Sequence, residues 1–217
     1  MTDERPHLRT TRTAYDDIAA LYTEMFGDPR RLAPLDRAMI SGFAETVRGP
    51  VLDAGCGPGR VTAYLRGLGR DASGVDLSPE MIGHARAAHP GISFSEGTIA
   101  ALDAADGSFG GVLSWYSVIH TPPELLPEIF AEFHRVLTPG GHLLLGFFAT
   151  AGETEPQPYD HKVTAAYCLP VDHVGALLAA AGFTEIARME REPADDERRR
   201  HGRLLAVRSR PAGAKDE

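Results

Sequence analysis

The sequence has few cysteines and no long apolar run. Its two cysteines, Cys56 and Cys168, are too few for a disulfide framework or a cysteine-based zinc site. The densest apolar stretch, residues 142–150, is much shorter than the roughly 20 residues of a membrane helix. Residues 1–12 are polar and carry no secretory signal pattern. These absences predict a cytoplasmic protein.

Positive charge is also scarce. The 217 residues include 22 basic and 30 acidic side chains, which gives a formal charge of −8. This balance argues against a chain that neutralises nucleic-acid phosphates or adheres to an anionic membrane. Lys162 and Lys215 are the lysines among the 22 cations, and the rest are arginines. We expect a small-molecule partner, no nucleic-acid or membrane partner, and a monomer or a homodimer.

With 43% hydrophobic and 24% charged residues, the composition is that of a globular protein of ordinary domain size. Apolar residues recur at helical spacing from Tyr15 to Met25 and again from Leu35 to Val47. The two segments predict an amphipathic helical pair over residues 1–49 that covers the active site. Residues 50–210 are expected to form the main domain, as one globular unit with this cover.

From Val51 onward, short apolar strands alternate with helical patterns. Five such strands are expected, at residues 51–54, 72–76, 92–95, 110–115 and 142–148. This alternation predicts an α/β fold, a three-layer Rossmann-like sandwich with a mostly parallel sheet. After a helix at residues 174–181, two strands at 183–190 and 204–208 follow without a crossover helix and are expected to pair antiparallel.

Three connecting segments carry their own signals. Thr121 and Glu124 match a capping box, which predicts the start of a helix that runs through Leu137. Residues 150–159 are rich in Gly, Pro and Glu and suggest an insertion or a mobile lid. Residues 195–200 are three acidic side chains followed by three basic ones, and this mixed charge predicts a surface loop.

A glycine-rich turn runs from Asp53 to Gly59, where the first strand meets a helix. Ligands of open parallel sheets bind outside the carboxyl ends of the strands, and Asp76 ends the next strand. The turn lacks the Gly-Lys-Ser/Thr of a phosphate-binding loop, and Arg60 stands where a dinucleotide fingerprint has its third glycine. Two carboxylates favour a ligand with a ribose and an ammonium but no phosphate, such as S-adenosylmethionine.

Three motifs in order resemble the class I S-adenosylmethionine-dependent methyltransferases. They are Val-Leu-Asp-Ala-Gly-Cys-Gly-Pro-Gly at 51–59, Gly-Val-Asp-Leu-Ser-Pro-Glu-Met at 74–81 and His-Arg-Val-Leu-Thr-Pro-Gly-Gly at 134–141. The resemblance spans about residues 15–208 and implies a seven-stranded sheet with an antiparallel C-terminal strand. It also implies that the protein is an enzyme that moves a methyl group from S-adenosylmethionine to a small organic acceptor.

The resemblance also implies roles for individual residues. Asp53 would hold the methionine end of the cofactor and Asp76 the ribose hydroxyls, whereas Thr98 stands where many relatives carry Asp. Further cofactor contacts would come from the glycine turn (Gly55, Cys56, Gly57, Gly59), the adenine site (Leu77, Met81, Gly97, Ile99), the fourth strand (Ser114, Trp115) and the N-terminal cover (Tyr15, Tyr22). Cys56 is expected to fill space in the turn rather than to act as a nucleophile.

Methyl transfer needs alignment of the reactants, and a base only where the acceptor must lose a proton. His120 is the candidate base, against the simpler interpretation of a histidine that hydrogen-bonds near a helix start. Tyr116 and His161 are the other residues expected at the acceptor. No metal site is expected, because no convergent Cys/His spacing is present. Two alternatives stay open: a nicotinamide-dependent reductase and a non-catalytic S-adenosylmethionine-binding module.

Overall fold

The computed structural model describes residues 5–195 and 197–209. The predicted domain limits at residues 1 and 210, and residue 196 of the predicted surface loop, lie outside these ranges. The helices are α1 (Pro6–Phe26), α2 (Pro34–Thr46), α3 (Arg60–Gly67), α4 (Pro79–Ala88), α5 (Leu126–Val136) and α6 (Val171–Ala180). The strands are β1 (Val51–Ala54), β2 (Ala72–Asp76), β3 (Phe94–Glu96), β4 (Phe109–Trp115), β5 (Leu137–Ala149), β6 (Gln157–Tyr159), β7 (Ala166–Cys168), β8 (Phe183–Arg191) and β9 (Arg200–Arg208).

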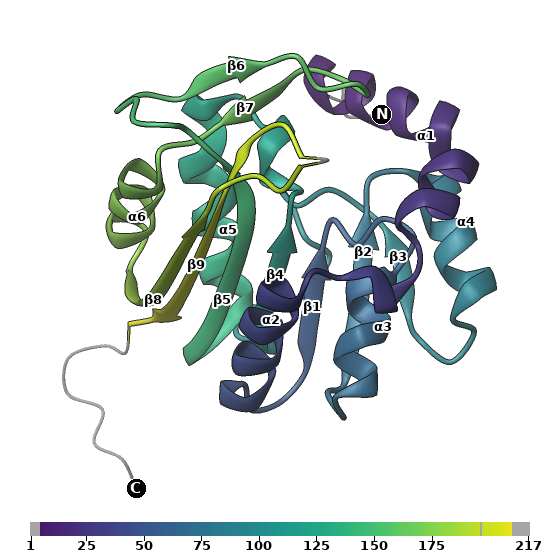
Figure 1. Cartoon of the computed structure of the whole chain (residues 1–217). Helices are drawn as coiled ribbons and strands as arrows, with labels where there is room; N and C mark the ends of the chain where they lie inside the picture. The colour runs from purple at the N-terminus through teal and green to yellow at the C-terminus, as the bar shows by residue number, and fades with distance from the viewer. Residues whose placement is uncertain (1–4, 196, 210–217) are drawn as a thin grey trace, which may run out of the picture.

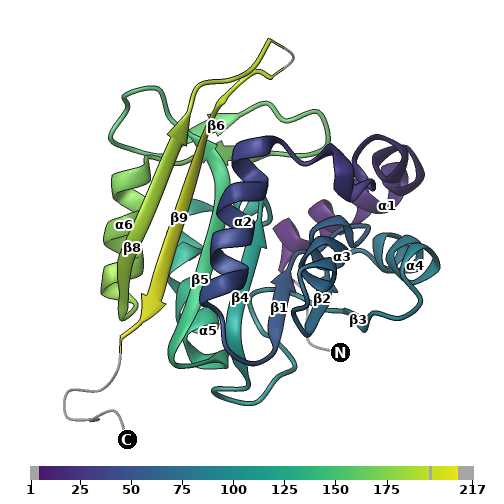
Figure 2. The same cartoon turned by 60° about the horizontal axis from the view of Figure 1, so that its bottom comes forward.

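Seven of the described strands form one sheet in the order β3-β2-β1-β4-β5-β9-β8 (Figures 1 and 2). Strands β1 to β5 pair in parallel, and β9 runs antiparallel to both β5 and β8. The predicted fold class, a mostly parallel seven-stranded sheet with an antiparallel C-terminal strand, is confirmed. The strand order reverses direction between β1 and β4, which is the position where open sheets of this kind bind ligands.

Side chains of the central strands point alternately to the two faces of the sheet, and a hydrophobic core lies on each face. Leu143 and Leu145 of β5 pack into the core under α5 and α6, whereas Leu144 between them packs into the core under α2 and α3. Successive side chains of a strand point to opposite faces, so a continuous apolar run is the pattern of a strand covered on both sides. Figure 2 shows these two helical layers on either side of the sheet.

The two N-terminal helices pack in different ways. Helix α2 buries Ile40 and Phe43 against the sheet and belongs to one of its cores. Helix α1 lies across the carboxyl edge of the sheet (Figure 1), and Ala19 is its one buried residue. Helix α1 therefore lies over the edge at which the parallel strands end, whereas α2 covers one face of the sheet. Within the described residues, no helix combines the length and apolar character needed to span a bilayer.

The structure corrects one expectation about the connections and adds detail to another. The predicted capping box is wrong: helix α5 begins at Leu126, and no side chain caps it. Pro122 is extended, with ψ at 133°, and Pro123–Leu125 form a separate 3-10 turn, so Thr121 stands too far from the helix to cap it. The segment expected as an insertion or a mobile lid at residues 150–159 contains β6, which pairs antiparallel with β7 as a small two-stranded sheet.

Candidate functional site

The carboxyl ends of β1, β2 and β4 open into a cavity of about 940 Å³. Asp53 of β1 and Asp76 at the end of β2 both line it. The two strands are parallel neighbours, and Asp53 pairs with Gly74, two residues before Asp76, so both side chains lie near the same edge of the sheet. Helix α1, the β6–β7 hairpin and the tip between β8 and β9 close its other sides. Ligand pockets generally have volumes of about 300–1,000 Å³, so this cavity can hold a nucleoside and a second small molecule.

The turn after β1 needs glycine at two positions. Gly55 has φ at +84°, and a Cβ there would lie 2.2 Å from the Cβ of Ser117. Gly59 has φ at +81° where α3 begins, and a Cβ there would lie 2.7 Å from the Phe94 ring. Both positions therefore require the absence of a side chain and a left-handed backbone. Between them, Cys56 is buried and its pKa is raised well above the ordinary value by burial, which keeps it a thiol.

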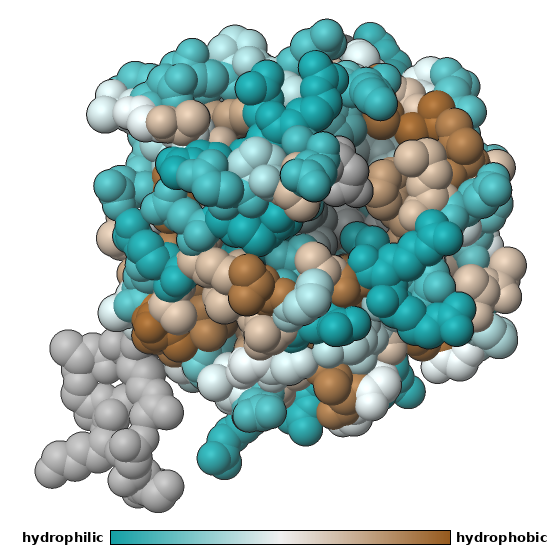
Figure 3. All heavy atoms as spheres, viewed as in Figure 1, coloured by the Kyte–Doolittle hydropathy of each residue, from teal (hydrophilic) through white to brown (hydrophobic). Residues whose placement is uncertain are grey.

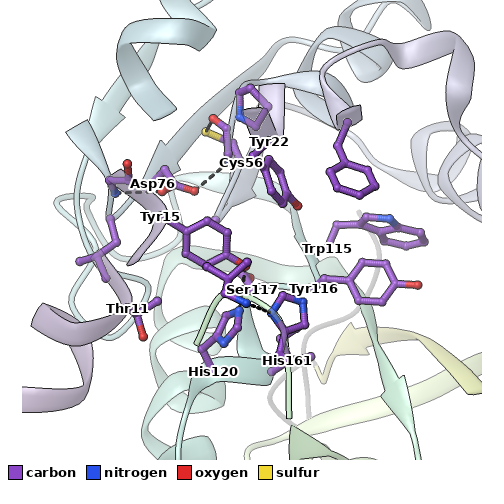
Figure 4. Close-up of a pocket in the computed structure, with 18 of the residues that line it drawn as sticks. Thr11, Tyr15, Tyr22, Cys56, Asp76, Trp115, Tyr116, Ser117, His120 and His161 are labelled. Carbon is purple, nitrogen blue, oxygen red and sulfur yellow. Dashed lines mark hydrogen bonds between the residues drawn. The ribbon is translucent and has the colours of Figure 1, made fainter. Parts of the chain in front are cut away.

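Asp76 is held by backbone donors. Its Oδ2 accepts from the Gly57 N–H at 2.7 Å and its Oδ1 from the Ser78 N–H at 2.9 Å (Figure 4). Burial raises the pKa of this carboxyl, although the backbone hydrogen bonds act in the opposite direction. The lone pairs that these N–H groups leave unused can accept hydrogen bonds from two hydroxyls of a ligand.

Asp53 carries a buried acceptor that has no partner. Its Oδ2 accepts from the Thr62 hydroxyl at 2.6 Å, whereas Oδ1 is buried on the cavity wall without a hydrogen bond to any described group. Burial raises the pKa of Asp53 to about 7, against the opposing hydrogen bond from Thr62. An unpaired buried carboxylate oxygen is costly unless a donor arrives, and a ligand ammonium is such a donor. The residues present therefore fit the amino end of S-adenosylmethionine.

Most of the predicted site residues lie on this one cavity. Those that line it are Tyr15, Tyr22, Asp53, Gly55, Cys56, Gly57, Asp76, Leu77, Gly97, Thr98, Ile99, Trp115, Tyr116, His120 and His161. Gly59, Met81 and Ser114 do not line it. Gly59 lies behind the turn against Phe94, Met81 is buried in α4, and Ser114 is buried with its hydroxyl 2.5 Å from that of Ser117.

His120 connects three segments of the chain. Its Nδ1 lies 2.8 Å from the Ala165 carbonyl and its Nε2 lies 2.8 Å from the Tyr15 hydroxyl. A carbonyl only accepts, so Nδ1 carries the proton and Nε2 accepts from Tyr15. Burial lowers the pKa of His120 to about 4, so the imidazole is neutral at pH 7. Its ring also packs edge-on against His161, with centroids 5.3 Å apart (Figure 4).

Tyr116 is the one described non-glycine residue with positive φ, at 61°. Its hydroxyl accepts from Nη2 of Arg203 at 2.5 Å and also contacts Nδ1 of His201. The guanidinium of Arg203 is fully buried, lies 4.4 Å above the Trp115 ring, and pairs with Asp36 at 2.9 Å. This buried ion pair holds the residues that end β4, and burial raises the pKa of Tyr116 to about 12.

Other residues of the wall carry no sequence signal for a site. They are Asp36, Phe148, Tyr159, Lys162, Glu197, Arg198, Arg199 and His201, and Ser117 beside Tyr116 also lines the cavity. Residues 197–199 belong to the segment expected to be a surface loop, and Arg198 and Arg199 are indeed exposed. The side chains of this tip also line the cavity, which the sequence did not predict. No three His, Cys, Asp or Glu side chains converge as metal ligands do within the part of the chain that the structure describes.

Comparison with known proteins identifies the family. Residues 51–141 match the family model described as "Methyltransferase domain". An uncharacterised methyltransferase of Synechocystis is 31% identical over 191 residues, which covers 80% of this chain and 84% of that protein. The chain belongs to the class I S-adenosylmethionine-dependent methyltransferases. The predicted family, and S-adenosylmethionine as the cofactor of that family, are confirmed.

Other methyltransferase relatives are longer than this chain. The malonyl-[acyl-carrier protein] O-methyltransferase of Erwinia billingiae is 34% identical over 140 residues, which covers 62% of this chain and 55% of that protein. The chain spans about half the length of the first curated relatives that it matches. Among solved structures, the 1,6-didemethyltoxoflavin-N1-methyltransferase of Burkholderia thailandensis has the same fold, with a TM-score of 0.70, 22% identity, and coverage of 96% of this chain and 92% of that one.

Proposed function

We propose that the protein binds S-adenosylmethionine at the carboxyl edge of β1 and β2 and methylates a small organic acceptor. The observation that carries the proposal is the pair of carboxylates on one cavity wall, with Asp53 Oδ1 left without a partner. The bound cofactor supplies an electrophilic methyl group on a sulfonium. Asp53 would hold its amino group and Asp76 its ribose hydroxyls.

The protein's own contribution is orientation and exclusion of water. Orientation of two reactants can lower a barrier by about 7–11 kcal/mol. Helix α1 covers the cofactor end of the cavity with Tyr15 and Tyr22, and the β6–β7 hairpin covers the other end with His161. The rings of Tyr15 and Tyr22 pack edge-on, with centroids 5.6 Å apart. Aromatic rings beside a sulfonium are favourable, since a ring face attracts a cation by about 0.5–2 kcal/mol.

His120 is proposed as the group that accepts a proton from the acceptor. The proton would move from the acceptor's O–H or N–H to Nε2 of His120, whose other nitrogen keeps its proton on the Ala165 carbonyl. Tyr15 donates to the same Nε2, so the acceptor must displace the Tyr15 hydroxyl for the transfer to occur. The remaining site residues that line the cavity, Gly97, Thr98 and Ile99 among them, are proposed to border the adenine.

Two ligands separate this proposal from its alternative. Calorimetry should detect S-adenosylhomocysteine binding, whereas NADH should not bind. Asp76→Ala should weaken that binding at least tenfold, because a hydrogen bond to a charged group contributes about 1.5–3 kcal/mol and 1.4 kcal/mol is tenfold in affinity. Asp103→Ala, at an exposed position outside the cavity, is the matched control. Tight binding of NADH alone would instead support the nicotinamide-dependent reductase.

Activity is tested separately from binding. The protein is incubated with labelled S-adenosylmethionine and a metabolite extract, and transfer of label to a small molecule is the expected result. If the protein binds S-adenosylhomocysteine but no labelled product appears, the result would support the non-catalytic binding module. The absence of nucleic-acid and membrane partners is proposed from the charge balance and is checked by binding measurements. The protein is proposed to be a monomer or a homodimer, and sedimentation distinguishes the two.

A further inference from the structure

The end of the cavity away from Asp53 and Asp76 is rich in cations. Three cations line it: Lys162 of the β6–β7 hairpin and Arg198 and Arg199 of the β8–β9 tip. This gathering of positive charge is notable in a chain with a formal charge of −8. The acidic residues Asp160 and Asp195 belong to the same two segments but do not line the cavity.

The carboxylates that do line this end already have partners. Asp36 pairs with Arg203 at 2.9 Å, and Glu197 pairs with Arg191 at 2.5 Å. No described residue forms an ion pair with Lys162, Arg198 or Arg199. This end of the cavity therefore keeps three cations that no described carboxylate neutralises, which makes its potential positive.

The same end has a wall of aromatic rings. Phe148 lies at its centre, with ring centroids 5.0 Å from Tyr116, 5.4 Å from Tyr159 and 5.7 Å from His201. The guanidinium of Arg199 lies 4.6 Å above the Tyr159 ring, so one of the cations is held against this wall. A ligand with an aromatic ring and an adjacent anionic group would fit here, because its ring can stack on these rings and a guanidinium can bind its carboxylate or phosphate.

The opposite rim has a different character. Leu21, Met25 and Phe26 of α1 line the cavity and are 58%, 49% and 39% exposed. Figure 3 shows hydrophobic residues gathered over α1 and hydrophilic residues over the tip of β8 and β9 beside it. An acceptor that enters between these rims meets apolar surface on one side and positive charge on the other.

We infer that the acceptor is a small aromatic anion, a carboxylate or a phosphate, whose ring lies on the wall at Phe148 and whose charge faces Lys162, Arg198 and Arg199. This inference rests on the proposed function and names its acceptor class.

The test uses Trp115, the single tryptophan of the chain, which lines the cavity. The protein is first saturated with S-adenosylhomocysteine, and its fluorescence is then followed on addition of matched probes. The anions are 4-hydroxybenzoate and phenyl phosphate, and the neutral partners are 4-hydroxybenzamide and phenol. We expect each anion to bind at least tenfold more tightly than its neutral partner, with affinity that falls as salt rises. The comparison of the two anions distinguishes carboxylate from phosphate.

Substitution of the cations provides the second arm. The triple variant Lys162→Gln/Arg198→Gln/Arg199→Gln should lose at least tenfold in anion affinity and most of its salt dependence, with unchanged affinity for S-adenosylhomocysteine. Arg48→Gln, at an exposed position outside the cavity, is the matched control. Neutral probes that bind as well as the anions, anions that do not bind, or a triple variant that binds them normally would overturn the inference. Failure of the wild-type protein to bind S-adenosylhomocysteine would instead contradict the proposed function.

Discussion

At the scale of single residues, Asp53 links cofactor binding to pH. Burial raises its pKa to about 7, while binding of a ligand ammonium requires the carboxylate form. Below pH 7 the ligand must therefore displace a proton, and we predict that affinity for S-adenosylhomocysteine falls by up to about tenfold per pH unit. Calorimetry from pH 5 to 8 checks this slope. Asp53→Asn should bind weakly with no such slope, and a flat wild-type profile would contradict the assignment.

The same carboxyl also affects stability. A raised pKa in the folded state means that its stabilising contribution is present below the ordinary pKa of 3.8 and is lost as pH rises through about 7. Asp53→Asn removes the buried charge, so we predict that the ligand-free variant melts at a higher temperature than the wild type at pH 8. The difference should disappear near pH 4. Thermal unfolding at the two pH values measures it, and equal melting temperatures at pH 8 would be evidence against it.

His120 should show its low pKa in the kinetics. With a pKa of about 4, its base form predominates at every pH above 5, so the rate on a proton-bearing acceptor should not inflect near 6.5. General base catalysis contributes about 10²–10⁴-fold, and we predict that His120→Ala lowers kcat by at least 10²-fold across this range. The pH profile of kcat is the measurement. A wild-type inflection near pH 6.5 that is lost in the variant would show that burial does not lower the pKa of this histidine.

At the scale of elements, α1 depends on a few polar contacts. Asp16 Oδ1 accepts from the Ser78 hydroxyl at 2.5 Å, and Tyr15 donates to His120 at 2.8 Å, while Ala19 is the helix's one buried residue. A helix with so little buried surface should open locally. We predict that Asp16→Ala speeds amide hydrogen exchange in residues 6–26 by roughly 3- to 10-fold, since one hydrogen bond contributes about 0.5–1.5 kcal/mol.

The neighbouring exposed residue supplies the control for this prediction. Asp17→Ala should leave exchange in α1 unchanged, because Asp17 is exposed and does not line the cavity. Saturation with S-adenosylhomocysteine should slow the exchange of α1 in both variants, since Tyr15 and Tyr22 lie over that part of the cavity. Equal exchange in the Asp16 and Asp17 variants would mean that apolar contacts, not this hydrogen bond, hold the helix.

Elements with local signals could be predicted from the sequence, and others could not. The strand and glycine turn at residues 51–59 carry an apolar run and positive-φ glycines, and the structure has them as expected. The β6–β7 hairpin was missed because its strands have three residues each and Pro158 interrupts the pattern. The position of Arg198 and Arg199 over the cavity depends on how β8 and β9 extend past the sheet, which no local pattern encodes.

At the scale of the whole molecule, one buried ion pair links the N-terminal helix α2 to the C-terminal strand β9. Arg203 of β9 and Asp36 of α2 are buried partners 167 residues apart, and the same guanidinium holds Tyr116. Loss of one partner of a buried pair costs about 3–5 kcal/mol, because it leaves a buried charge alone. We predict that Arg203→Met lowers the free energy of unfolding in urea by about this amount. Arg37→Met, at an exposed position in α2, is the control.

The double variant separates stability from the geometry of the site. Asp36→Leu/Arg203→Met removes both charges and should recover most of the lost free energy of unfolding, since apolar residues of similar volume often replace a buried pair without loss. Tyr116 would still lack the donor that holds its hydroxyl, so its φ of 61° would have less support. We therefore expect the double variant to fold and to bind S-adenosylhomocysteine but to bind the acceptor more weakly than the wild type does. A double variant that binds acceptor as the wild type does would show that the ion pair serves folding alone.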